Sequence, residues 1–244
     1  MLSTVREPAQ TEEEQKETGG YLAVLRDRNF VWLLALNVLF VAVGYEVFAL
    51  LPPFAKNYAG VSERWVGLIW LANTLLIVLI QLPVSKALEG RRRMLALALM
   101  NLLWAAAALI VLAAGDLLNG TSAALVLIFA TMIFGVGETL QGPTQAPLVA
   151  DLAPDRLRGR YFALSAMSWS AGSIVGPAVG GPLLGWHPLA VWPIAAAVCL
   201  LAAVGCLALE RRLPRNVRRT PTPTPEPVTL TPLEPPLDLA PERL

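Results

Sequence analysis

The sequence predicts an all-α membrane protein with six transmembrane helices, and three observations support this fold class. Six long stretches carry almost no charged residues, and about 20 apolar helical residues cross the ~30 Å hydrocarbon core of a bilayer. The composition is 55 % hydrophobic and 15 % charged, with a mean hydropathy of +0.57, whereas soluble domains average about 25 % charged residues. The basic residues are also sorted between alternate loops, which is typical of multi-pass membrane proteins.

The six spans follow one another with short connections. In chain order they are predicted at Asn29–Ala55, Trp65–Ser85, Met94–Gly115, Ala123–Ala150, Tyr161–Trp186 and Pro188–Leu209. Only two acidic residues, Glu46 and Glu138, interrupt them. Because the connections are short, consecutive helices are expected to pack as antiparallel neighbours, so residues 29–210 should form one bundle.

The distribution of lysine and arginine predicts the orientation of the bundle. Of the 19 Lys and Arg residues, all except Lys56 and Arg64 lie before span one, after span six, or in the loops that follow spans two and four. Positively charged loops remain in the cytoplasm, so both termini are expected there, in a multi-pass protein of the cell membrane. The first 20 residues lack the apolar core of a cleavable signal, so span one is expected to direct insertion.

Two terminal segments flank the bundle. Residues 1–28 are charged and are predicted to form a linker-like cytoplasmic segment. Residues 211–244 are rich in proline, and such a composition buries too little apolar surface to fold. This second segment is therefore predicted to be a disordered cytoplasmic tail.

The sequence lacks the patterns that enzymes and metal sites require. His187 is the only histidine, and no cluster of ionisable residues has metal-ligand spacing. No nucleophile lies beside a base, and no glycine-rich phosphate loop is present. Cys199 and Cys206 lie on one helix face, where small apolar packing is their expected role. We therefore expect no enzyme, catalytic residue, metal or cofactor, and the net charge of +1 gives no reason to expect nucleic acid as a partner.

Polar residues inside the predicted spans mark a candidate path for a solute or a proton. A carboxylate near the bilayer centre costs about 2.5–3.5 kcal/mol on insertion scales, so it usually faces water, is paired or is protonated. Polar residues of span four recur at helical spacing and therefore share one face. The path candidates are Thr131, Glu138, Gln141 and Gln145 of span four, Glu46 of span one and Gln81 of span two. The alternative for Glu138 is a helix-to-helix hydrogen bond that fixes packing.

Span five carries a glycine repeat that predicts a close helix contact. Gly172, Gly176 and Gly180 recur every four residues, and Gly181 follows them. Glycines let a neighbouring helix approach closely in a membrane, and Pro177 is expected to bend the span. The contact is either a static one or one that slides or hinges, as in transporters with interrupted helices.

Three segments give the chain a resemblance to a known family. Gly172–Gly181 resembles the Gly-x-x-x-Gly-Pro-x-x-Gly-Gly motif in the fifth helix of drug–proton antiporters of the major facilitator superfamily. Glu89–Arg93 is similar to the end of that family's loop signature, and Asp151–Arg160 is similar to the loop after its fourth helix. The resemblance covers residues 22 to about 212.

The resemblance implies one six-helix half of that family's twelve-helix fold. Glu138 stands where the N-terminal half typically has an arginine, three residues before Gln141-Gly142, and this favours the C-terminal half. The implied function is proton-coupled efflux of a small molecule by a secondary transporter, with Glu138 binding a proton or a cationic substrate. Because the family's substrate path lies between two halves, the implied partner is a second six-helix half, either a separate chain or a second copy. The alternative is a non-transporting membrane subunit or a truncated, inactive fragment.

Overall fold

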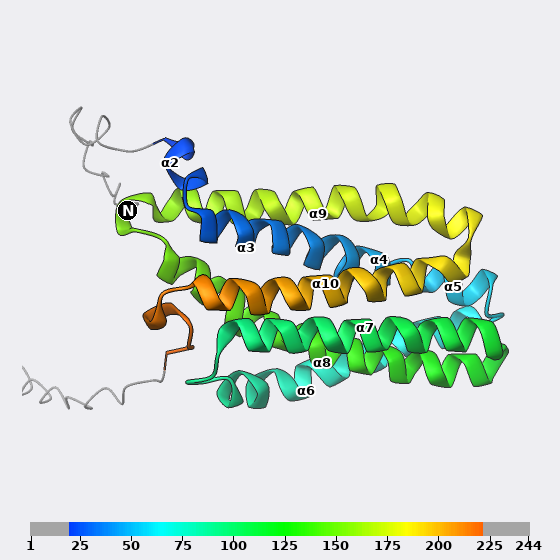
Figure 1. Ribbon diagram of the computed structural model, residues 1–244. Coiled ribbons are helices and arrows are strands. Elements are labelled where there is room, and N and C mark those ends of the chain that lie inside the picture. Colours follow the sequence, from blue (N-terminus) through cyan, green and yellow to red (C-terminus); the bar gives the residue numbers. More distant parts are fainter. Residues whose placement is uncertain (1–19, 222–244) are drawn as a thin grey trace, which may run out of the picture.

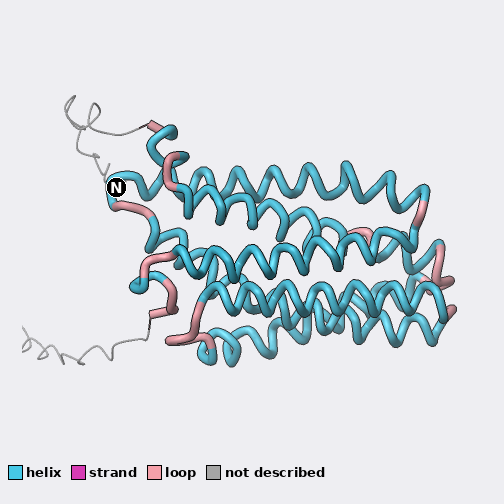
Figure 2. Tube along the Cα trace, viewed as in Figure 1, coloured by secondary structure: helices cyan, strands magenta, loops and turns pink. Residues whose placement is uncertain are grey.

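The computed structural model describes residues 20–221 as a bundle of long helices joined by short loops (Figures 1 and 2). Six of these helical segments are long and apolar enough to cross a membrane. They are Arg28–Asn57, Glu63–Ala87, Arg93–Leu117, Gly120–Leu152, Asp155–Trp186 and Pro188–Arg212. Each contains one predicted span, so the six-span prediction is confirmed.

The first span is a composite of several helical pieces, whereas the other five each contain one long helix. It consists of α3 (Arg28–Leu39), the π-helix η1 (Phe40–Tyr45), α4 (Glu46–Phe48) and α5 (Leu51–Asn57), and the short helix α2 (Tyr21–Leu25) precedes it. Asp27 caps α3, because its side chain accepts hydrogen bonds from the backbone nitrogens of Asn29 (3.0 Å) and Phe30 (3.2 Å).

The remaining spans are formed by α6 (Glu63–Ala87), α7 (Arg93–Leu117), α8 (Gly120–Leu152), α9 (Arg158–Trp186) and α10 (Val191–Arg212). Short 3₁₀ turns lie at Asp155–Leu157, Pro188–Ala190 and Arg215–Val217. Helix α9 continues through Pro177 without interruption. The first span, in contrast, departs from a regular α-helix at η1 and between α4 and α5.

The bundle is built from two three-helix units that pack in the same way. The first unit contains the α3–α5 span, α6 and α7, and the second contains α8, α9 and α10. The first helix of each unit packs on the second helix of the other unit, so α8 contacts α6 and the α3–α4 segment contacts α9. The third helices, α7 and α10, contact each other (Figure 1). Each unit has three spans, so the first helix of the second unit starts at the opposite end of the bundle from the first helix of the first unit. The two units are therefore an inverted repeat.

An aromatic cluster fills the centre of the bundle. Phe48 stacks on Phe134 at a centroid distance of 4.2 Å, and Trp104 stacks on the same Phe134 ring at 5.1 Å. The Trp104 indole nitrogen donates a hydrogen bond to the backbone oxygen of Phe134 (3.1 Å). Gly44 and Gly137 both face the Trp104 ring, and a Cβ atom on either glycine would collide with it. These glycines therefore make room for the indole.

Helices α6 and α9 are the least enclosed of the six. Within an 18-residue apolar stretch of each span, only 11 % of the α6 stretch and 17 % of the α9 stretch are buried, against 44 % or more in the other spans. Large apolar residues such as Leu75 and Val78 of α6 and Ile174 and Val179 of α9 are exposed. These two helices therefore present apolar faces that lipid or another protein must cover.

The described parts of the two terminal segments are folded against the bundle. Near the N-terminus, the Tyr161 hydroxyl donates a hydrogen bond to Asp27 Oδ2 (3.0 Å), and Val24 is buried. At the other end, α10 continues to Arg212, and residues 213–221 turn back and contact the α6–α7 loop. The prediction of a disordered tail from residue 211 needs correction for residues 211–221, because backbone hydrogen bonds hold them. Residues 1–19 and 222–244, which carry the rest of both predictions, lie outside the described residues.

Candidate functional site

A cavity of about 450 Å³ lies between the first span, α8 and α9. It is near the end of the bundle where α3 begins, α8 ends and α9 begins. Its lining residues are uncharged, and they combine amides and hydroxyls with aromatic and small apolar side chains. They are Asn37, Tyr45, Gln141, Gly142, Gln145, Ala146, Val149, Phe162, Ser165, Ala166 and Trp169. A mainly apolar cavity with a few polar groups is the usual form of a small-molecule site.

A chain of hydrogen bonds crosses the cavity wall from the first span to α8 and back. The Tyr45 hydroxyl donates to Gln141 Oε1 (2.5 Å), and Gln141 Nε2 donates to Gln145 Oε1 (2.7 Å). Gln145 Nε2 then donates to Asn37 Oδ1 (2.5 Å). Gln141 and Gln145 are four residues apart, so they lie one above the other on α8. The two glutamines therefore form the polar side of the cavity.

The chain continues from the first span to α9. Asn37 Nδ2 donates to the Ser168 hydroxyl (2.7 Å), which donates to the backbone oxygen of Ser165 (2.7 Å). Asn37 and Ser168 are buried, and in a buried setting unpaired polar groups are costly. The network thus satisfies polar groups from three helices and fixes their positions at the cavity.

The π-helix η1 places Asn37 and Tyr45 on the same side of the first span. Residues eight apart point about 80° away from each other in a regular α-helix, since each residue turns about 100°. In η1, the Glu46 backbone nitrogen donates to the Val41 oxygen, five residues back. One extra residue in such a turn reduces the difference to about 20°. The distortion therefore allows both side chains to reach Gln141 and Gln145.

Aromatic rings form another part of the cavity wall. Tyr45 and Trp169 have ring centroids 5.0 Å apart, and Phe162 also lines the cavity. The Tyr45 ring packs edge-on against Trp104 of the central cluster (5.4 Å). One tyrosine thus connects the apolar core, the aromatic wall and the polar network.

Two path candidates of span four lie outside the cavity. Glu138 is half-buried, and within residues 20–221 its carboxylate makes no hydrogen bond or ion pair. Thr131 is fully buried, and its hydroxyl donates to the backbone oxygens of Leu127 (3.1 Å) and Ile128 (2.9 Å) of its own helix. The predicted stripe therefore reaches the cavity only through Gln141 and Gln145.

The other two path candidates lie at helix contacts. Gln81 Nε2 donates to the backbone oxygen of Thr139 (3.4 Å), which connects α6 to α8. Glu46 is half-buried on α4, and its side chain lies against Gly176 of α9. Neither residue lines the cavity.

The glycine repeat of α9 packs on the first span, as its spacing predicts. A Cβ atom on Gly172 would lie 2.8 Å from the backbone oxygen of Val38, and one on Gly180 would lie 2.9 Å from Leu50 Cδ1. Gly181 has no neighbour within 4 Å of such an atom, and Pro177 is exposed. The first three glycines of the motif therefore make the contact, and the last one does not.

Several site residues were missed by the sequence analysis. Asn37 is a polar residue in the first span and could have been noticed, but its position relative to Tyr45 depends on the π-helix. Ser165, Ser168 and Trp169 follow no polar periodicity, because they lie on a helix of small and aromatic residues. Spacing along a single helix shows only that helix's contribution to a cavity with three walls.

The described residues hold no arrangement that suggests a bound metal ion. In residues 20–221, no group of three or more His, Cys, Asp or Glu side chains is placed to hold a metal ion. Cys199 and Cys206 are buried free thiols on α10, consistent with the packing role expected of them.

Comparison with known proteins places the chain in a family. Residues 34–240 match the Major Facilitator Superfamily. The "Uncharacterized MFS-type transporter YhjO" of Bacillus subtilis is 28 % identical over 171 residues, which are 68 % of this chain and 41 % of that protein. "Multidrug resistance protein MdtH" of Edwardsiella ictaluri is 27 % identical over 183 residues, which are 74 % of this chain and 41 % of that protein. The MdtH of Aeromonas hydrophila is 36 % identical over 95 residues, which are 39 % of this chain and 24 % of that protein.

The chain thus spans about two fifths of the length of these first two relatives. No solved structure matches it significantly. The family match, in contrast, covers most of the chain and agrees with the resemblance seen in the glycine motif and the two loops. This chain belongs to the Major Facilitator Superfamily.

Proposed function

We propose that the chain is the C-terminal six-helix half of a secondary transporter that exports a small molecule across the cell membrane. The observation that carries the proposal is the cavity whose wall joins Asn37, Tyr45, Gln141 and Gln145 in one hydrogen-bond network. Amides and a hydroxyl at a cavity surface can exchange hydrogen bonds with a passing solute, while the aromatic wall supplies apolar contact. In the proposed state the cavity faces the cytoplasm, since both termini are proposed to lie on that side.

A second six-helix half is the partner that this function requires. A cavity bounded by the first span, α8 and α9 supplies one wall of a path, and α6 and α9 carry exposed apolar faces. Transporters with internal repeats bind solute at the contact between repeats and alternate access by rocking one against the other. We propose that a matching half, a separate chain or a second copy, covers these faces, with lipid around the rest.

The lining favours a substrate with an apolar, aromatic body and few hydrogen-bonding groups. The cavity has three aromatic side chains and no charged one, so it offers ring stacking and neutral hydrogen bonds. Several relatives carry the name multidrug resistance protein, which fits export of such compounds.

Transport assays test the assignment of the cavity. The full chain, with a matching half, is reconstituted into liposomes and uptake of a fluorescent aromatic cation is measured. Gln141→Leu removes the middle of the network, and we expect the transport rate to fall about tenfold or more because hydrogen bonds made in the path are lost. Gln81→Leu is the matched control, because it is the same change at a glutamine outside the cavity. Equal rates for both variants would contradict the assignment.

We propose that Glu138, the half-buried carboxylate of α8, couples transport to protons. A carboxyl group inside the membrane that makes no ion pair can carry a proton during transport. Glu138→Gln is expected to abolish uptake driven by a pH gradient and to leave exchange of labelled for unlabelled substrate intact. If the pH gradient drives this variant at the wild-type rate, Glu138 is not the coupling group.

A further inference from the structure

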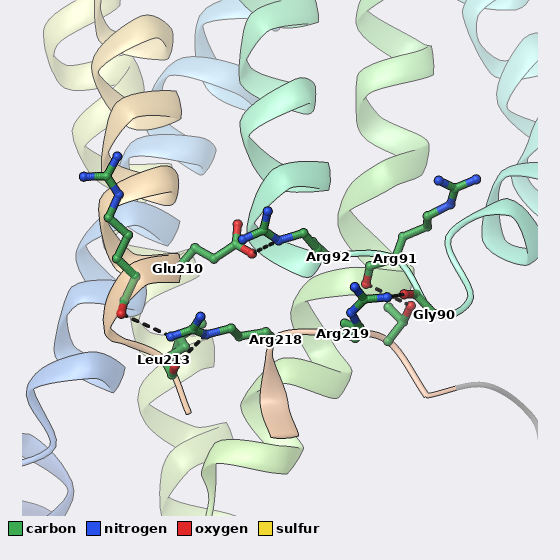
Figure 3. Close-up of polar contacts among 9 residues, drawn as sticks. Gly90, Arg91, Arg92, Glu210, Leu213, Arg218 and Arg219 are labelled. Carbon is green, nitrogen blue, oxygen red and sulfur yellow. Dashed lines mark hydrogen bonds and ion pairs between the residues drawn. The ribbon is translucent and has the colours of Figure 1, made fainter. Parts of the chain in front are cut away.

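A pocket lined entirely by arginines lies at the end of the bundle where α10 ends and α7 begins. Its volume is about 270 Å³, and its lining residues are Arg92, Arg215, Arg218 and Arg219. Figure 3 shows Arg92, Arg218 and Arg219. One of these arginines comes from the α6–α7 loop and three come from the segment after α10. The pocket shares no lining residue with the cavity proposed for transport, and nothing in the transport function uses it.

The segment after α10 is held in place by backbone hydrogen bonds. The Gly90 nitrogen donates to the Thr220 oxygen (3.2 Å), the Thr220 nitrogen to the Arg91 oxygen (3.0 Å), and the Arg93 nitrogen to the Arg218 oxygen (2.8 Å). Arg92 and Arg219 are paired as an isolated antiparallel bridge. The pocket arginines are therefore attached to a fixed backbone.

Neutral acceptors orient two of the guanidinium groups. Arg218 Nε donates to the Leu213 oxygen (2.7 Å), and its Nη2 donates to the Arg211 oxygen (3.2 Å), as Figure 3 shows. These carbonyls belong to the C-terminal end of α10, where backbone oxygens lack helical partners. Arg219 Nη1 donates to the Gly90 oxygen (3.3 Å). Such bonds fix the side chains but leave their positive charges in place.

The positive charge of the pocket exceeds the negative charge beside it. Glu210, which is almost fully buried, pairs with Arg92 at 2.5 Å. Within the part of the chain that the structure describes, Arg215, Arg218 and Arg219 make no ion pair. Like charges held close together repel each other, and a bound anion would relieve that repulsion. A planar guanidinium group fits two oxygens of a phosphate at once.

We propose that this pocket binds the phosphate of an anionic phospholipid headgroup. The span of α10 ends at Arg212 and that of α7 begins at Arg93, so the pocket lies at the level of the headgroups. On the cytoplasmic side, basic residues beside a transmembrane helix attract anionic lipids. A soluble phosphate compound offers the same chemistry, so the test must separate the two sources.

Lipid retention measures the proposal directly. The full-length chain is incorporated into bilayers containing phosphatidylglycerol and phosphatidylcholine, extracted, and analysed by native mass spectrometry for bound lipid. The test variant is R215Q/R219Q, which spares the structural bonds of Arg218. The matched control is R26Q/R156Q, which removes two exposed arginines from the same end of the bundle. We expect retention of phosphatidylglycerol to fall about tenfold in the test variant and to remain unchanged in the control.

Three further results would overturn the proposal in different ways. Equal loss in both variants would mean that net charge alone retains lipid. Full retention of phosphatidylglycerol by R215K/R219K would also mean that charge alone holds the lipid, because lysine keeps the charge but lacks the planar fork. The lysine variant also serves as the test if the glutamine variant does not fold. R215Q/R219Q could also retain lipid unchanged but lose binding of inorganic phosphate in calorimetry. This result would mean that the ligand is a soluble phosphate compound and not a lipid.

Discussion

Two of the contacts that join the three-helix units occupy equivalent places but are built from different groups. Where α9 meets the first span, a Cβ atom on Gly176 would lie 2.7 Å from the backbone oxygen of Ala42. Where α6 meets α8, a Cβ atom on Gly135 would lie 2.5 Å from Asn73 Oδ1, the end of a side chain. A helix backbone cannot move without moving the whole helix, whereas an amide can rotate away. The first contact is therefore restricted to glycine, and the second can adjust.

The largest effect is expected from a methyl group at the first contact. Gly176→Ala should lower the free energy of unfolding by about 3 kcal/mol, because the new atom overpacks a backbone-to-backbone contact. The measurement is equilibrium unfolding in mixed micelles with increasing denaturing detergent. Gly181→Ala is the control from the same motif, since an added Cβ atom has no neighbour within 4 Å there. A stable Gly176→Ala protein would show that α9 can shift along the first span.

A smaller effect is expected from the same substitution at the second contact. Gly135→Ala should lower the free energy of unfolding by about 1 kcal/mol, the lower end of the usual cost of overpacking, because the Asn73 side chain can change its rotamer to make room. The same unfolding assay measures it beside Gly176→Ala. If the two alanine variants lose equal stability, the distinction between a backbone neighbour and a side-chain neighbour is wrong.

The smallest change is a gain in stability at the second contact. Asn73 is buried, and its Oδ1 atom has no hydrogen-bond partner among residues 20–221, so Asn73→Leu should raise the free energy of unfolding by about 1 kcal/mol. Asn101→Leu is the matched control, because the Asn101 amide donates to the Leu97 oxygen (2.8 Å) and is already satisfied. A loss of stability in Asn73→Leu would instead mean that this amide oxygen has a partner in the membrane.

The span positions could be predicted from sequence because hydropathy acts over whole helices. The contact face of α9 could also be predicted, since Gly172, Gly176 and Gly180 recur with the period of one helix turn. The π-helix could not, because a shift in backbone hydrogen bonding leaves no trace in hydropathy; its Gly44 lies against Trp104 of another helix. Proline-rich composition likewise concealed the folded segment 213–221, whose stability comes from pairing with residues distant in sequence. Contacts between helices, rather than properties of one helix, account for what the sequence did not reveal.

The hydrogen-bond chain at the cavity also has a fixed direction. It ends on the Ser165 backbone oxygen, and a carbonyl can only accept, so the Ser168 hydroxyl must use its proton there. Ser168 must then accept from Asn37, and each earlier group must orient its amide accordingly, back to Tyr45. The Tyr45 hydroxyl at the start of this chain of hydrogen bonds donates its hydrogen to Gln141, and its oxygen lone pairs remain free to accept. A molecule that enters the cavity would thus meet a hydrogen-bond acceptor at Tyr45, and compounds bearing an N–H or O–H group would bind there more tightly than compounds without one.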